Sequence, residues 1–131
     1  MDKENIFTMD TSGIKFGNGC TEEVGYEAKR FGIKKALVIT DKKIEKLGLF
    51  QTVKDSLVRY GVDFSVYNEV VTEPTDTSFK NASSFASDGD YDGFIAVGGG
   101  SVMDTTKAAN LYSTYPADFL DYVNAPIGKG I

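Results

Sequence analysis

The residues best suited to chemistry form a turn near the end of the chain, where an apolar run at 93–97 gives way to a helical pattern. The turn consists of Gly98, Gly99, Gly100 and Ser101. The first amides of a helix have no partners within the helix, and the helix dipole adds partial positive charge there. Glycines let a phosphate approach the backbone without a Cβ atom in the way. We therefore predict a phosphate site, because a plain turn needs only two glycines; Ser101 either donates its hydroxyl or caps the helix.

Two polar segments follow the other apolar runs. Asp41 comes directly after the run at 36–40, where a carboxylate can accept hydrogen bonds from both ribose hydroxyls and repel a 2′-phosphate. Its alternative role is to cap the segment that starts at Lys42. Glu73 and Thr75 flank a proline in the loop after the run at 62–67, which is otherwise a plain turn. In a parallel sheet these strand ends converge on one crevice, so an acid for ribose and a glycine turn for pyrophosphate predict a dinucleotide site.

The elements that would position these residues alternate along the chain. Continuous apolar runs at 36–40 and 93–97 are typical of strands buried on both faces, and the alternating run at 62–67 indicates a strand nearer the sheet edge. Apolar spacing predicts four helices, at about 21–31, 50–60, 77–86 (with Asp76 and Thr77 as cap candidates) and 101–112. This order indicates an α/β fold, a doubly wound, mostly parallel Rossmann-like sheet. Residues 6–18 predict an N-terminal β-hairpin in front of it.

Composition excludes several classes of function. The 131 residues suit one domain, and they contain no histidine, so a Ser-His-Asp triad or a histidine metal site within this chain is excluded. A net charge of −5 argues against nucleic-acid binding. No apolar run is long enough for a membrane span, and no signal peptide is expected. The single cysteine, Cys20, excludes an internal disulfide and predicts a cytoplasmic location.

Several stretches resemble the iron-containing (group III) alcohol dehydrogenases. Residues 96–109, with the glycine turn at their start, are similar to the N-terminal domain of that family, and so are residues 38–41 and 73–75. Residues 110–112 and 119–129 look most like its hydroxyacid-oxoacid transhydrogenase branch. The resemblance covers nearly the whole chain, including the predicted hairpin.

The resemblance implies roles for the site residues. Gly98, Gly99, Gly100 and Ser101 would hold the pyrophosphate of NAD, with NADP less favoured, and Asp104 would lie at the cleft between cofactor and substrate. Asp41 would hold the adenosine ribose, and Thr75 or Glu73 would line the adenine side. The full enzyme would transfer a hydride between nicotinamide and a small alcohol, hydroxyacid or aldehyde. Iron or another divalent metal would be bound by one aspartate and three histidines of a helical C-terminal domain, so this chain alone is expected to be inactive.

The domain organisation follows from the same resemblance. Residues 1–131 would form one NAD(P)-binding domain, with a hairpin extension at 1–19 and an α/β core at 20–131, cut before the metal-binding domain. The hairpin would pair with that of a second subunit to give a homodimer. Two alternatives remain open. One is a non-catalytic nucleotide-binding module, alone or with a separate partner. The other is a flavodoxin-like domain, which would need a phosphate loop where this chain has residues 40–42.

Overall fold

The computed structural model describes residues 9–131, and within this range the strands form one open parallel sheet. The strands are β1 (Lys35–Ile39), β2 (Asp63–Tyr67) and β3 (Gly93–Ala96), in the spatial order β2-β1-β3. Ile39 at the end of β1 lies opposite Tyr67 of β2 and Ala96 of β3. The carboxyl ends of the strands therefore lie side by side at one edge of the sheet, as the sequence predicts.

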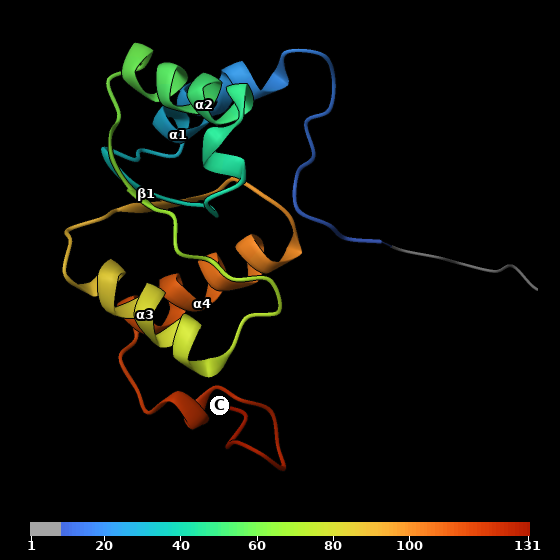
Figure 1. The fold of residues 1–131 in the computed structure, drawn as a ribbon, viewed down its shortest axis with the longest axis vertical. Coiled ribbons are helices and arrows are strands. Elements are labelled where there is room, and N and C mark those ends of the chain that lie inside the picture. The colour runs from blue at the N-terminus through green and yellow to red at the C-terminus, as the bar shows by residue number, and fades with distance from the viewer. Residues whose placement is uncertain (1–8) are drawn as a thin grey trace, which may run out of the picture.

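Helices cover both faces of the sheet (Figure 1). The helical segments are η1 (Cys20–Glu23), α1 (Val24–Arg30), η2 (Ile44–Lys46), α2 (Gly48–Arg59), α3 (Asp76–Ser87), α4 (Gly100–Thr114) and η3 (Phe119–Asp121). Figure 1 shows α1 and α2 on one face of the sheet and α3 and α4 on the other. This two-sided arrangement confirms the doubly wound α/β fold.

The central strand explains why its sequence is continuously apolar. Ala36 and Val38 of β1 pack with α1 and α2, while Leu37 and Ile39 pack with α3 and α4. All four side chains are fully buried. Successive residues of a strand point to opposite faces, so a strand between two helical layers needs apolar residues at every position. β2, whose sequence alternates, lies at an edge as predicted. β3 lies at the other edge of the described sheet with Ala96 exposed, so the expectation that its apolar run is buried on both faces is wrong.

Two predicted helix starts need correction. Thr75 caps α3, in place of the expected Asp76 or Thr77, because the Thr75 and Ser78 side chains each bond the other residue's backbone. α4 begins at Gly100 and not at Ser101, with Gly99 as its cap residue. Neither shift moves a helix relative to the sheet.

The predicted N-terminal hairpin is not formed in those of its residues that the structure describes. Residues 9–16 contain no strand, and residues 6–8 lie outside the described residues. Ile14 is 85% exposed and Phe16 98% exposed, so no surface within residues 9–131 buries these two side chains. The segment is attached to the domain by its polar side, because Lys15 binds Glu23 and Glu27. An isolated two-stranded hairpin has little stability of its own, and nothing here covers it.

Candidate functional site

The glycine turn between β3 and α4 leaves open space at its outer side. Gly98 has φ 155°, and a Cβ added there would lie 2.6 Å from Cγ2 of Val102, so the backbone itself requires glycine at this position. A Cβ added at Gly99 or Gly100 would meet nothing within 4 Å. The fold therefore explains the first glycine, whereas the other two keep an exposed stretch of backbone bare.

The start of α4 leaves hydrogen-bond donors for a ligand. Gly99 caps the helix without a side chain that could accept a bond, and the first helical bond runs from the Met103 amide to the Gly99 carbonyl at 3.0 Å. The amides of Gly100, Ser101 and Val102 therefore have no partner within the helix. Ser101, in the first turn, is half-buried and is not the cap. Bare backbone, free amides and the positive end of the helix dipole together suit an anion.

Asp41 has two oxygens with different roles. Its Oδ1 accepts hydrogen bonds from the amides of Lys43 and Ile44, both at 2.8 Å, and so caps the turn at Lys42 that leads into the short helix η2. The capping role that the sequence left open is therefore confirmed. Because both of these bonds go to one oxygen, the capping role leaves Oδ2 available to a ligand.

A hollow of about 240 Å³ lies beside Asp41. It is lined by Asp41, Lys42, Lys43, Asn68, Glu69, Val70, Val71 and Thr72. Lys42 pairs with Glu69 across its rim at 3.1 Å. Below it Tyr67 is buried, and burial, with a smaller contribution from the Glu69 carboxylate, raises the pKa of Tyr67. The phenol therefore stays uncharged, and the charges at this hollow come from its acids and the two lysines.

Strand register places Asp41 next to the glycine turn. Because Ile39 lies opposite both Tyr67 and Ala96, Asp41, Glu69 and Gly98 each stand two residues beyond matching positions on adjacent strands. Asp41 and Glu69 also form an isolated β-bridge. Gly98 borders a separate hollow of about 370 Å³ between the end of β3 and the helices α1 and α2. The two halves of the predicted site are thus neighbours at one sheet edge, although they line different hollows.

The remaining predicted residues lie further out. Glu73 is exposed and has φ 54°, an uncommon conformation for a residue other than glycine. Thr75 uses its hydroxyl to accept a hydrogen bond from the Ser78 amide at 3.1 Å. Asp104 is exposed on the second turn of α4. None of these three lines the hollow beside Asp41.

Two positions with a bearing on the site were missed from the sequence. Glu69 lines the Asp41 hollow, and the rule that singled out Asp41, an acid just beyond a strand, would also have selected it. Thr40 looks like the last residue of an apolar strand, but it is fully buried and donates its hydroxyl to the Val97 carbonyl at 2.8 Å. No sequence pattern reveals that bond, because its partner lies 57 residues away.

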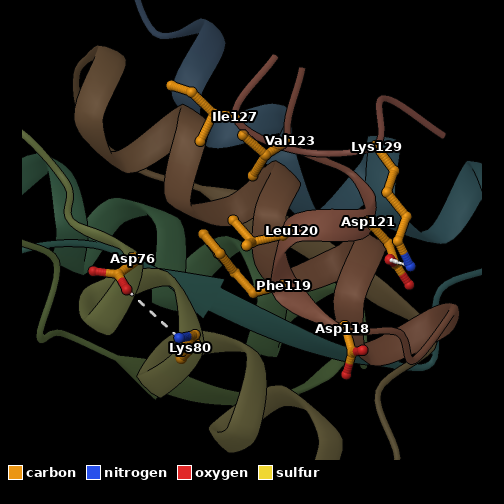
Figure 2. A pocket seen from close by; sticks show the side chains of 9 residues that line it. All are labelled: Asp76, Lys80, Asp118, Phe119, Leu120, Asp121, Val123, Ile127 and Lys129. Atoms are coloured by element: carbon orange, nitrogen blue, oxygen red, sulfur yellow. Dashed lines mark hydrogen bonds and ion pairs between the residues drawn. The ribbon is translucent and has the colours of Figure 1, made fainter. Parts of the chain in front are cut away.

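A larger hollow, about 710 Å³, lies elsewhere (Figure 2). It separates α3 from the C-terminal segment and is lined by Asp76, Lys80, Asp118, Phe119, Leu120, Asp121, Val123, Ile127 and Lys129. Lys80 pairs with Asp76 at 3.5 Å, and Lys129 pairs with Asp121 at 2.6 Å (Figure 2). Because these cations face acids of their own, the hollow offers little charge to an anion, and no predicted site residue lines it.

Within residues 9–131, no group of three or more histidine, cysteine, aspartate or glutamate residues is placed to hold a metal ion. The donors of the described chain therefore do not fit an iron centre. In the same range, no helix is both long and apolar enough to cross a membrane.

The sequence matches the family model described as iron-containing alcohol dehydrogenase over residues 11–130. It is 56% identical over 125 residues to the mitochondrial hydroxyacid-oxoacid transhydrogenase of Bos taurus, and 53% identical to that of Homo sapiens. Each alignment covers 95% of this chain and 27% of the relative. The chain thus spans about a quarter of the length of these relatives, whose names state a mitochondrial location where the single cysteine predicts the cytoplasm.

Solved structures show the same architecture. An NADH-dependent butanol dehydrogenase from Thermotoga maritima matches with a TM-score of 0.81 and 31% identity, over 90% of this chain and 30% of its own. An alcohol dehydrogenase from Oenococcus oeni matches with a TM-score of 0.77 and 36% identity, over 84% of this chain and 29% of its own. The Rossmann-like fold therefore occurs here as it does in these dehydrogenases.

Proposed function

The chain belongs to the iron-containing alcohol dehydrogenase family, and from this premise we propose that its 131 residues form the domain that binds the nicotinamide dinucleotide. The glycine turn Gly98–Gly100, with Ser101, holds the pyrophosphate through backbone amides. Asp41 accepts hydrogen bonds from the adenosine ribose through Oδ2, and its charge disfavours the 2′-phosphate of NADP. Thr75, Glu73 and Asp104 contribute to the outer parts of the same site.

The bare turn is the observation that carries this proposal. A Cβ at Gly99 or Gly100 meets nothing within 4 Å, and Gly99 has φ −86°, which any residue can adopt. Packing and backbone conformation thus leave these two glycines unexplained. A phosphate close to the backbone explains them, because a methyl group would occupy the place of its oxygens.

The experiment is a calorimetric titration of the 131-residue chain with NAD⁺, NADH and NADP⁺. Gly99→Ala should leave the thermal unfolding temperature within a few degrees of the original, since the added methyl meets open space. The same change should weaken NAD⁺ binding about tenfold or more, because one misplaced or unmade charge-assisted hydrogen bond costs about 1.5–3 kcal/mol.

Gly48→Ala is the matched control, because a Cβ there also meets nothing within 4 Å and the residue begins a different helix, α2. It should leave NAD⁺ binding unchanged. Binding that Gly99→Ala leaves intact, or an original chain that binds no dinucleotide at millimolar concentration, would refute the assignment of this turn.

For the whole protein we propose hydride transfer with a small alcohol or hydroxyacid as donor, in line with the reaction for which the relatives are named. A bound nicotinamide would accept the hydride that leaves the alcohol carbon, and the hydroxyl proton would pass to water. The residues of this chain bind and orient the dinucleotide. They do not fit iron, so the isolated chain should bind the cofactor without turning over substrate. Alcohol-dependent reduction of NAD⁺ by the pure chain would contradict this.

The names of the relatives favour a mitochondrial over a cytoplasmic location for this protein. One half-buried cysteine, Cys20, suits any compartment that keeps thiols reduced, so it does not distinguish the two. Imaging of the tagged protein in its own cells tests this.

A further inference from the structure

Thr40 lies between the two halves of the candidate site. It follows β1 directly and precedes Asp41, and it is fully buried. Its amide donates to the Tyr67 carbonyl of β2 at 2.9 Å. Its hydroxyl donates in the opposite direction, to the carbonyl of Val97 at 2.8 Å. One residue thus connects the ends of all three strands at the edge where the site lies.

The hydroxyl bond extends the sheet by one step. The paired register of β1 and β3 ends with Ile39 opposite Ala96. Beyond it, the Val97 amide donates to the Ile39 carbonyl at 2.9 Å, and the Val97 carbonyl accepts from Thr40. Both backbone polar groups of Val97, the residue before Gly98, are therefore hydrogen-bonded, one to Ile39 and the other to Thr40. Without the hydroxyl, the Val97 carbonyl would be left without this partner beside a buried residue. An unpaired buried polar group destabilises a protein by more than a typical hydrogen bond stabilises it.

We propose that Thr40 is a positioning residue for the dinucleotide site, an inference that rests on the proposed function. It fixes the span between Asp41, which takes the adenosine ribose, and the glycine turn, which takes the pyrophosphate. Thr40 is buried and does not touch the ligand itself. A ligand held at two points binds most tightly when the spacing of those points is set before it arrives. Loss of the hydroxyl releases Val97 and with it the position of Gly98.

The test compares ligands that span the site with one that does not. NAD⁺ contacts both Asp41 and the turn, whereas adenosine contacts only the Asp41 side. Thr40→Val removes the hydroxyl at nearly constant volume. It should weaken NAD⁺ binding about 3- to 10-fold, because the loss of one ordinary hydrogen bond changes a dissociation constant by about this factor. Adenosine binding, followed by NMR titration, should change less than about twofold. A general loss of stability would not separate the two ligands.

Two further variants isolate the hydroxyl in case the valine side chain is not accommodated. Thr40→Ser and Thr40→Ala both remove the methyl group, and only serine retains the hydrogen bond. Serine should bind NAD⁺ as the original chain does, and alanine should match valine. Thr106→Val is the control of the same chemistry, since Thr106 is buried and donates within its own helix, to the Val102 carbonyl at 2.7 Å. It should leave both ligands unaffected.

The outcomes are distinct. Weaker NAD⁺ binding in the valine and alanine variants, with serine and adenosine unaffected, supports the positioning role. Equal weakening of NAD⁺ and adenosine, or NAD⁺ binding that none of the variants changes, overturns it while leaving the proposed function in place. Failure of the original chain to bind NAD⁺ overturns the proposed function itself.

Discussion

At the scale of single residues, Asp41 combines a structural and a ligand-binding role in one carboxylate. Oδ1 holds the amides of Lys43 and Ile44, and Oδ2 is left for the ribose. An asparagine keeps a side-chain oxygen for the amides and loses the charge, whereas an alanine loses both. Substitution by each in turn therefore separates the two roles.

We expect Asp41→Asn to unfold at nearly the original urea concentration, and Asp41→Ala to lose about 1 kcal/mol, the usual value of a helix-capping side chain. Both should reduce the preference for NAD⁺ over NADP⁺, because the repulsion of the 2′-phosphate is gone. Urea unfolding and calorimetric titration measure the two effects. An asparagine variant that keeps the original preference would show that the charge of Asp41 does not select the cofactor.

The site residues show how far the sequence alone can lead. Asp41 and Gly98 were predictable because each follows an apolar run, and parallel strands bring such positions to one edge. The roles of Thr40 and Thr75 were not, because a hydroxyl directed at a distant carbonyl and one directed at its own helix look alike in a sequence. Glu69 was predictable by the Asp41 rule.

At the scale of elements, Asp92 holds together the amino end of the sheet. Its carboxylate, just before β3, accepts hydrogen bonds from the amides of Lys34 at 3.0 Å and Lys35 at 2.8 Å, at the start of β1. Its own amide donates to the Lys35 carbonyl at 3.0 Å. The amides of Lys35 and then Lys34 lower the pKa of Asp92, because they stabilise the charged form.

This gives a prediction for the dependence of stability on pH. A carboxyl group whose pKa is lower in the folded state stabilises the fold above its unfolded pKa of about 3.9, and this contribution is lost as the pH falls through the folded pKa. Asp92→Asn should therefore unfold at lower urea than the original chain at about pH 6, and the two should converge toward about pH 2. Asp63→Asn, an exposed position on β2, should show a smaller difference. A gap for Asp92→Asn that stays constant with pH would contradict the explanation.

The elements were easier to predict than their ends. Apolar runs fixed β1 and β3 to within one residue. Burial on both faces explains the run of β1, whereas β3 lies at an edge of the described sheet and leaves Ala96 exposed. The ends depend on local hydrogen bonds, such as the pair between Thr75 and Ser78 that starts α3. The described residues of the predicted hairpin, 9–16, form no strand for another reason, because two short segments around a turn become strands only where a second surface buries their apolar side.

At the scale of the whole molecule, the N-terminal segment presents an uncovered apolar surface. Ile14 and Phe16 are exposed on either side of Lys15, whose ion pairs with Glu23 and Glu27 attach the segment to the domain. The two carboxylates raise the pKa of Lys15, so the attachment is charged throughout the physiological range. The apolar side chains of Ile14 and Phe16 are therefore held outward, and Ile14 lines a shared hollow with Phe31, which is 75% exposed. Contiguous exposed apolar side chains of this kind mark interaction surfaces.

We therefore expect the chain to form dimers through this segment. The sequence likewise predicts that the N-terminal segments of two subunits pair. Replacement of Ile14 and Phe16 by serine should raise the dimer dissociation constant about tenfold or more, because each buried side chain of this size contributes about 1.5–3 kcal/mol. Ile127→Ser is the control, because Ile127 is likewise largely exposed, at 76%, but lies in the C-terminal segment. It should leave the dimer dissociation constant unchanged. Sedimentation over a range of concentrations measures the dissociation constant, with NAD⁺ binding as a check that the domain is intact.

If the control variant dissociates as readily as the double variant, association is unspecific and depends only on exposed apolar area. If neither dissociates, the pairing surface lies elsewhere. The next place to test is the outer edge of β3, which pairs with no other strand of residues 9–131, since an open strand edge can pair with another chain.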